Sequence, residues 1–372
     1  MLPSAVRRPV IRLVRSLRRH AFGPPAVEGV PPGLPLEVLD ALCLEHLGQR
    51  LARCSHLHLS SWKPRGTYRL QITTHGGRAW RLIFKDELYA TDLIPALGDL
   101  PILPGPPEFA IYGLEEPRLE RFLPKVYWRR EVEAGRHFQY VMEDLDGAFE
   151  RMRKERRQLV LAARALLQFQ EALKGAFERT PHPYLIRYDE TWSLRLIDYV
   201  ARGLDAYRAG RQVSSVDELC RSWQRVARVH GRDEFHEPGL YGPIHGDYNR
   251  SNVHLQAREQ VLAKVVDWEW AGIGLPHADL AALLKLVGPE DEAALLDVFI
   301  AGNPGLDAEA HWRTFRWCQL ERRLMDAGFL ARQQMASPRR VRWLEGYIDR
   351  AAADALQAVR RLEAAPGRPA VA

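Results

Sequence analysis

The sequence predicts an α+β protein in which a small group of strands precedes a larger helical part. Three strand-like runs lie near the N-terminus, at residues 56–61, 66–73 and 79–84. The turn from His75 to Arg78 contains two glycines and joins the last two runs as a hairpin. From Leu159 onward, most apolar residues recur at helical spacing. At 372 residues the chain is long enough for two packed parts, each with its own core.

The helical patterns lie mostly after the strands. One short pattern precedes the strands, at residues 36–47. The others are expected near Leu159 and at residues 192–207, 216–230, 280–287, 290–301, 308–334 and 338–362.

Composition and charge are those of an ordinary globular protein. Hydrophobic residues make up 46% of the chain, and no apolar run approaches the roughly 20 residues that a membrane-spanning helix needs. The four cysteines are widely scattered and show no metal-binding spacing, which favours free thiols in a reducing compartment. We therefore expect a soluble, cytoplasmic protein, whose oligomeric state the sequence leaves open.

The N-terminal segment is strongly basic. Residues 1–20 hold six arginines and no acidic residue, and apolar residues interleave with them. Such a segment can form an amphipathic helix on an anionic membrane surface, and a mitochondrial-type leader has a similar composition. We interpret residues 1–35 as a solvated basic extension and linker, with at most weak peripheral membrane contact. No nucleic acid partner is expected.

Residues 241–281 carry the strongest functional signal. His245, Gly246 and Asp247 are followed by Asn252 and by two apolar runs, 253–255 and 261–266, with a polar turn between them. Two such runs joined by a polar turn predict a β-hairpin. The second run ends at Asp267, so the hairpin would bring Asp247, Asn252 and Asp267 together at one end.

These three side chains suit phosphoryl transfer from ATP. One carboxylate orients the attacking hydroxyl and accepts its proton, a role that fits Asp247. An amide oxygen and a second carboxylate hold Mg²⁺, a role that fits Asn252 and Asp267. Each residue alone fits a turn equally well. Their combination at this spacing favours an active site.

The motifs H-G-D-x-x-x-x-N, D-W-E-W-A and G-x-P-x-x-D-L-A resemble those of the aminoglycoside phosphotransferase / choline kinase-like family. The resemblance extends over roughly residues 50–290. It implies a two-lobed protein kinase-like fold, with a small antiparallel β-sheet N-lobe and a mostly helical C-lobe. It also implies a small-molecule kinase that uses ATP and Mg²⁺ and phosphorylates a hydroxyl group. Gly246 and the sequence Asp267-Trp268-Glu269 differ from the corresponding protein kinase motifs, so a protein kinase is a weaker interpretation.

The resemblance implies roles for several further residues. Lys85 would contact the ATP α/β-phosphates, and Glu108 (chosen over Glu115) would pair with Lys85. The phosphate-covering loop would lie at residues 60–67, with Ser61 and Gly66 among its nucleotide-binding residues and with Ser61, Arg65 and Thr67 as alternative donors. This loop has one glycine where the family usually has two or more, and glycine normally allows the backbone to approach phosphate.

The hinge between the lobes and the support of the catalytic loop are implied in the same way. Adenine would contact the backbone near Met142, Glu143 and Leu145. His245 and Asp279 would support the catalytic loop rather than touch substrate. The expected divisions are an N-terminal extension at 1–35, an N-lobe at 36–142, a C-lobe at 143–365 and a tail at 366–372.

The sequence does not name the acceptor, and no substrate-binding residue is assigned. Helices at 188–230 are where such a family builds its acceptor pocket. The last two helices are basic and aromatic and include Trp312, Trp317, Arg322 and Arg323, which weighs against a polycationic aminoglycoside and for a neutral or anionic acceptor. A solvated helix surface explains these residues equally well. The alternative is that the chain is a catalytically idle, kinase-like protein with a nucleotide-binding or regulatory role. The single-glycine loop favours this alternative.

Overall fold

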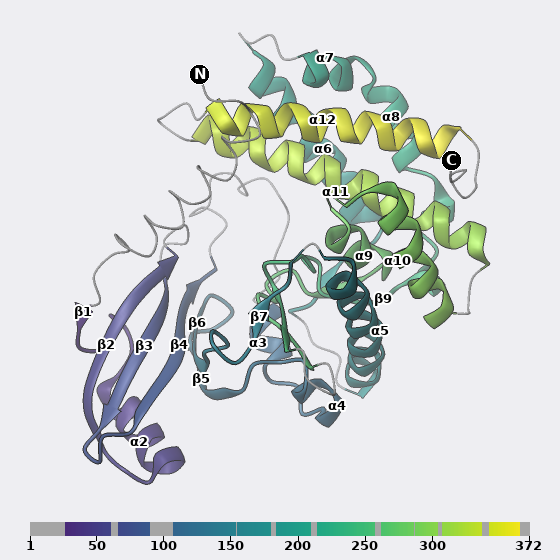
Figure 1. Ribbon diagram of the computed structural model, residues 1–372. Coiled ribbons are helices and arrows are strands. Elements are labelled where there is room, and N and C mark those ends of the chain that lie inside the picture. Colours follow the sequence, from purple (N-terminus) through teal and green to yellow (C-terminus); the bar gives the residue numbers. More distant parts are fainter. Residues whose placement is uncertain are drawn as a thin grey trace, which may run out of the picture. The chain divides into compact units, whose positions relative to one another are not determined.

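The computed structural model describes ten segments of the chain, which separate into two compact units (Figure 1). Unit 1 comprises the chain up to Leu88 together with Lys125–Glu133 and His137–Asp144, and unit 2 comprises the remainder. The described segments are 27–60, 66–89, 107–153, 155–179, 184–209, 214–256, 262–285, 287–303, 307–336 and 342–364. The basic residues 1–20, Ser61 and the tail at 366–372 lie outside these segments.

Unit 1 is built on an antiparallel sheet with the strand order β1-β2-β3-β4-β6-β5. The hairpin predicted around His75 is confirmed, since Thr73 pairs with Ala79 and the N–H of Thr74 donates to the carbonyl of Arg78 at 2.9 Å. Gly77 has a φ of +79°, a conformation that glycine adopts without strain. The strands are Val27–Glu28, Leu51–Ser60, Thr67–Thr74, Ala79–Leu88, Val126–Glu133 and His137–Glu143, from β1 to β6.

The core of unit 1 forms between this sheet and helix α2 (Leu36–Leu47). Leu39 and Cys43 of α2 are buried and belong to the same cluster as Leu70, Ile72 and Phe84 of the sheet. Alternation explains the sheet side of this cluster, because residues two apart in a strand point to the same face. The position of Lys85 in β4 is fixed by its two neighbouring strands in this sheet.

Unit 2 is mostly helical, as the sequence predicted. Its helices are α3 (Pro107–Ile111), α4 (Pro117–Glu120), α5 (Arg156–Arg179), α6 (Glu190–Arg208), α7 (Ser214–Arg221), α8 (Trp223–His230), α9 (His277–Leu283), α10 (Pro289–Gly302), α11 (Ala308–Ala336) and α12 (Arg342–Glu363). The single helix expected at 216–230 is divided in two at Ser222, whose backbone (φ −90°, ψ 7°) leaves the helical region.

Two small three-stranded sheets accompany these helices. One contains β7 (Glu150–Arg151), β10 (Val253–Gln256) and β11 (Leu262–Val265), and the other contains β8 (Ile186–Arg187), β9 (Gly242–Ile244) and β12 (Gly272–Gly274). The loops that follow β9 and β11 carry the residues predicted to act in catalysis.

Helix α11 runs through the middle of unit 2 and packs against α6, α9 and α12 (Figure 1). Its Gly328 lies against α6, where a Cβ atom would come within 3.0 Å of the Cα of Val200. A glycine therefore lets the two helices approach closely. Among the helices that the structure describes, none has the length and hydropathy that a membrane span requires.

Candidate active site

The predicted hairpin of residues 253–266 is present. Strands β10 and β11 are antiparallel, with Val253 opposite Val265, and the N–H of Val266 donates to the carbonyl of Asn252 at 3.0 Å. Asn252 directly precedes the first strand and Asp267 follows the second, so both lie at the same end of the hairpin. Apolar residues on both strands bury one face of this hairpin, which holds that end in place.

The loop before β10 has a backbone that only glycine permits at one position. Gly246 has a φ of +78°, and a Cβ atom there would lie 2.1 Å from the carbonyl oxygen of Trp270. The chain then turns back on itself, because the N–H of Asn249 donates to the carbonyl of Asp247 at 2.8 Å. The N–H of Asn252 donates in turn to the carbonyl of Asn249 at 3.0 Å. This tight loop brings Asn252 back to Asp247.

Both carboxylate oxygens of Asp247 accept hydrogen bonds. Its Oδ2 accepts from the Nδ2 of Asn249 at 2.9 Å and from the Nδ2 of Asn252 at 3.1 Å. Its Oδ1 is bound by Arg322, which lies 75 positions further along the chain. The Asp247 side chain is 22% exposed, so it is held in a fixed orientation but still open to solvent.

Arg322 of α11 is the residue at this site that the sequence did not reveal. One guanidinium nitrogen pairs with Asp247, and another donates to the carbonyl of Gly246 at 3.1 Å. The Nε lies 3.9 Å from the Oδ1 of Asp326. Burial acts to lower the pKa of Arg322, but the charges of Asp247 and Asp326 outweigh it and raise the pKa above its ordinary value. Arg322 therefore remains a cation beside Asp247.

Asp279 of α9 is fully buried and joins its helix to the loop. Its two oxygens accept from the backbone N–H of His245 at 2.7 Å and from that of Gly246 at 2.8 Å. The Nε2 of Gln170 on α5 lies 3.4 Å from the same carboxylate. Burial raises the pKa of Asp279 to about 7, although these hydrogen bonds act in the opposite direction.

His245 is also fully buried and connects the loop to the hairpin. Its Nε2 lies 3.1 Å from the carbonyl of Val266, and its Nδ1 accepts from the N–H of Asp247 at 3.2 Å. This pattern assigns the neutral tautomer with the proton on Nε2. Burial lowers the pKa of His245 to about 4, so the ring stays neutral near pH 7. The ring packs against Trp268 with centroids 4.4 Å apart.

Asp267 has an unusual backbone conformation. Its φ is +69°. Among the described residues, every other positive φ belongs to a glycine. Aspartate tolerates this region better than most residues, and such conformations concentrate at functional sites. The next residue, Trp268, is buried and donates from its indole nitrogen to the carbonyl of Val265 at 3.0 Å. The buried indole thus fixes the turn that carries Asp267.

The predicted nucleotide residues of unit 1 lie in or next to its sheet. Lys85 of β4 is buried, stands opposite Thr67 and Tyr140, and its Nζ is 3.8 Å from the Oε1 of Glu87. Gly66 directly precedes β3, and a Cβ atom there would meet His58 at 2.3 Å.

The hinge residues and the predicted glutamate show the following contacts. Met142 is buried in β6, and the N–H of Glu143 donates to the carbonyl of Lys125 at 2.8 Å. Leu145 begins the last segment of unit 2, and its carbonyl accepts from the N–H of Phe149 at 2.9 Å.

Glu108 of α3 is fully buried in unit 2 and accepts from the hydroxyl of Tyr112 at 2.8 Å. Lys85 and Glu108 belong to different units, so their pairing stays a prediction.

The side-chain oxygens at this end of the hairpin suit one kind of metal ion. Within the described segments, no group of three or more His, Cys, Asp or Glu side chains is arranged to hold a metal. An amide and a carboxylate oxygen, from Asn252 and Asp267, suit Mg²⁺, which prefers hard oxygen ligands and completes its shell with water and phosphate oxygens. The residues present therefore fit a nucleotide-bound magnesium ion better than a site made by protein alone.

Comparisons with known proteins define the class. The sequence model described as "Phosphotransferase enzyme family" matches residues 106–318, more than half of the chain. The chain belongs to this phosphotransferase family. The match begins after β4, which carries Lys85, and ends just before Arg322. The curated proteins contain no significant sequence match.

Solved structures show the same fold. A microcompartment-associated aminopropanol kinase is 16% identical with a TM-score of 0.56, over 84% of this chain and 93% of that one. The GDP and kanamycin complex of APH(2")-IIia is 14% identical with a TM-score of 0.54, over 87% and 99%. The choline kinase LicA from Streptococcus pneumoniae is 12% identical with a TM-score of 0.53, over 86% and 98%. The predicted kinase-like α+β fold is confirmed, and the family match makes the chain a phosphotransferase.

Asp279 gives a prediction on stability. Replacing Asp279 with asparagine is expected to destabilise the protein by about 2–3 kcal/mol near pH 4, because the amide NH2 group cannot accept a hydrogen bond from the second of the two buried N–H donors. Urea unfolding of the Asp279→Asn protein would measure the loss. Asp205→Asn, an exposed position on α6, is the matched control and should unfold like the wild type. Equal stability of the two variants would contradict the anchoring contact.

The raised pKa of Asp279 adds a pH dependence. The pKa is about 7 in the folded protein against an ordinary value of 3.8, so the folded state keeps a proton that the unfolded state releases. The contribution of this group to stability therefore falls as pH rises from about 4 to about 7. The stability difference between wild type and Asp279→Asn should shrink over this range. A difference that grows would show that the carboxylate is ionised throughout.

Proposed function

We propose that the protein transfers the γ-phosphoryl group of ATP to a hydroxyl of a small molecule. The observation that carries this proposal is the single hydrogen-bonded network around Asp247, which joins two carboxamides, a partly buried guanidinium and the end of the hairpin that bears Asp267. Phosphoryl transfer depends on positioning and on charge neutralisation rather than on covalent chemistry. A network that fixes one exposed carboxylate in this way suits that requirement.

Asp247 is proposed as the catalytic base. The carboxamides of Asn249 and Asn252 and the guanidinium of Arg322 hold its carboxylate in one orientation, so that an acceptor hydroxyl can donate to it. The hydroxyl proton would pass to this carboxylate as the oxygen attacks. Asn249 and Arg322 are positioning residues in this scheme, since they act through Asp247.

Asn252 and Asp267 are proposed to hold Mg²⁺. The Nδ2 of Asn252 already donates to Asp247, which leaves its Oδ1 to bind a cation. Bound Mg²⁺ would neutralise part of the phosphate charge. Asp279 binds the backbone N–H of His245 in the loop that leads to Asn252, and the ring of His245 contacts the carbonyl of Val266, directly before Asp267.

The nucleotide-binding residues predicted from the sequence remain proposals. Lys85 would contact the phosphates and pair with Glu108, Gly66 and Ser61 would donate to the phosphates, and the backbone around Met142, Glu143 and Leu145 would contact the adenine. The proposed nucleotide lobe is 36–142, and the proposed catalytic and acceptor lobe is 143–365.

The acceptor is proposed to be an amino alcohol, a sugar or an aminoglycoside-like compound. Structural relatives include an aminopropanol kinase, a choline kinase and a kanamycin complex, and each of these compounds carries a hydroxyl group. The test is transfer of labelled γ-phosphate from Mg·ATP into a mixed library of sugars, amino alcohols, aminoglycosides and nucleosides. A labelled product that is absent with the Asp247→Asn protein would support the proposal and name the acceptor class.

A second candidate is a kinase-like protein that binds nucleotide without catalysis. The pairing of Arg322 with Asp247 favours it, because that ion pair occupies one oxygen of the proposed base. Saturable Mg·ATP binding, together with no transfer to any compound of the library, would favour this candidate over the enzyme.

Lys85 gives a prediction on nucleotide use. The Lys85→Met protein is expected to lose about 10- to 100-fold in kcat/KM for ATP, because a cation aimed at the phosphates is removed. Steady-state kinetics with varied ATP would measure the loss. Lys125→Met replaces an exposed lysine of the same unit and should leave kcat/KM unchanged. An equal effect of both substitutions would argue against phosphate contact by Lys85.

A further inference from the structure

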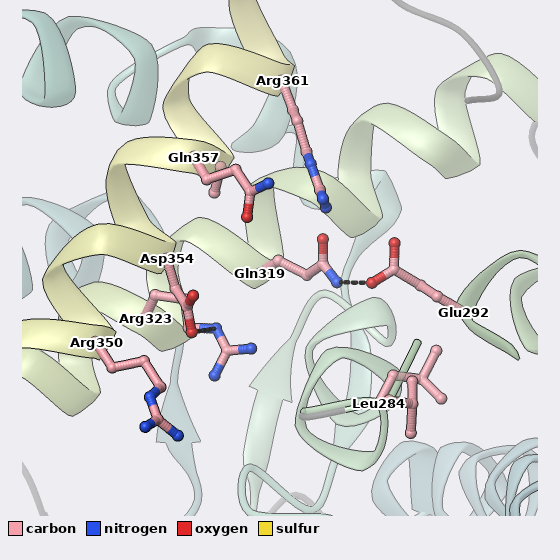
Figure 2. A pocket seen from close by; sticks show the side chains of 10 residues that line it. Leu284, Glu292, Gln319, Arg323, Arg350, Asp354, Gln357 and Arg361 are labelled. Atoms are coloured by element: carbon pink, nitrogen blue, oxygen red, sulfur yellow. Dashed lines mark hydrogen bonds and ion pairs between the residues drawn. The ribbon is translucent and has the colours of Figure 1, made fainter. Parts of the chain in front are cut away.

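A cavity in unit 2 lies apart from the catalytic loop. It has a volume of about 410 Å³ and lies where α10, α11 and α12 meet the end of α9 (Figure 2). None of the residues proposed for catalysis or metal binding lines it. Its size is within the range of pockets that hold small ligands.

Two helices supply the polar wall of this cavity. On α12, Arg350, Asp354, Gln357 and Arg361 follow one another at intervals of four, three and four residues, so they share one helix face. On α11, the cavity is lined by Gln319 and Arg323, which are also four residues apart. Figure 2 shows the Arg361, Gln357 and Gln319 side chains converging from the two helices.

The carboxylates of the wall already have partners. Glu292 is buried and bound by Arg316, and it accepts from the Nε2 of Gln319 at 2.6 Å. Asp354 lies 3.7 Å from the Nε of Arg323. These acidic groups therefore do not balance Arg350 and Arg361.

The guanidinium groups of Arg350 and Arg361 give the cavity its excess of positive charge. Within the part of the chain that the structure describes, neither has a carboxylate at ion-pair distance. Burial lowers the pKa of Arg316 behind the wall; the charge of Glu292 opposes this shift, and the nearby charge of Arg361 adds to it. The two arginines lie eleven residues apart on α12, so each places an uncompensated positive charge at one end of the wall, where it favours an anionic group.

We propose that this arginine-lined cavity binds a small polyanion, with a phosphate group or several carboxylates, as a second ligand of the protein. Guanidinium groups form forked, charge-assisted hydrogen bonds to phosphate and carboxylate oxygens. The carboxamide of Gln357 supplies a further donor, and Leu284, Val287 and Ala358 supply an apolar part of the wall. The described lining contains no aromatic ring, so it offers no stacking surface for a nucleobase.

Calorimetric titration of the full-length protein with inorganic phosphate and with citrate tests this proposal, at an ionic strength kept constant with sodium chloride. The two anions separate phosphate from carboxylate recognition. The double variant Arg350→Gln/Arg361→Gln should weaken binding by at least about tenfold, since each lost charged hydrogen bond is worth more than 1 kcal/mol. Arg360→Gln is the control: Arg360 is on the same helix but pairs with Glu218 and does not line the cavity.

A variant that binds the anion more tightly than the wild type is a further test, because a poorly folded variant would bind it less tightly. Asp354→Asn removes the carboxylate that competes for Arg323, and it should tighten anion binding by about threefold or more. No measurable binding to the wild type would overturn the proposal. Equal binding by the double variant and by Arg360→Gln would also overturn it. Because binding is measured without turnover, either result leaves the proposed phosphotransfer unaffected.

Discussion

The Asp247→Asn protein is expected to lose about 10²- to 10⁴-fold in kcat, while its affinity for Mg·ATP changes by less than about threefold. Asparagine keeps the shape of the side chain and can still contact Arg322, but it cannot accept the hydroxyl proton. The side chain of Asp247 contacts Asn249, Asn252 and Arg322. Of these, only Asn252 is proposed to bind Mg²⁺, and it contacts Asp247 through Nδ2 and not through the Oδ1 proposed as ligand. The loss should therefore appear in kcat, measured by transfer of labelled phosphate.

This substitution also leaves the partly buried Arg322 with one carboxylate neighbour fewer, and removing a partner from a largely desolvated cation destabilises a protein. The double variant Asp247→Asn/Arg322→Met removes both charges and separates the two effects. It should fold with a stability closer to that of the wild type and stay inactive. Asp205→Asn should keep full activity. Recovery of turnover in the double variant, or an equal loss of nucleotide binding and kcat, would contradict the role of Asp247 as base.

The sequence predicted this site well where its parts are close in the chain. The hairpin was predictable because two apolar runs and a polar turn lie within the single short stretch 253–266, and strand pairing then places Asn252 beside Val266. The need for glycine at position 246 was visible as a motif, but its physical cause was not. That cause is the carbonyl of Trp270, which leaves no room for a side chain.

Contacts between distant helices were not predictable. Arg322 is one of several arginines in the C-terminal helices. The apolar periodicity of residues 308–334 predicts only that Arg322 lies on a helix. Its contact with Asp247 depends on how α11 packs against α6 and α9, where Gly328 permits a close approach. No local pattern encodes a packing geometry of this kind. For the same reason the break at Ser222 was missed, since tertiary packing overrides a continuous helical pattern.

Arg322 is the second residue at which we expect a large effect. The Arg322→Met protein should lose about 10- to 100-fold in kcat, because one oxygen of Asp247 and the carbonyl of Gly246 lose the donor that fixes them. Removal of the cation also leaves Asp247 and Asp326 without the charge between them, so a loss of about 3–5 kcal/mol in stability is expected. Urea unfolding and steady-state kinetics would measure both.

A structural role and a positioning role for Arg322 predict different outcomes for three further measurements. The Arg322→Lys protein keeps the positive charge but loses the forked N–H donors of the guanidinium group. Compared with Arg322→Met, it should therefore recover stability more fully than kcat. In the Arg322→Ala protein, added guanidinium chloride at low millimolar concentration should restore part of the lost kcat, whereas sodium chloride at the same ionic strength should not. In the Asp247→Asn background, Arg322→Met should lower the residual kcat little further, since residues that act as a unit are not additive. Independent, additive losses without rescue by guanidinium would mean that Arg322 only supports the fold, and Asp247 would then owe its orientation to Asn249 and Asn252 alone.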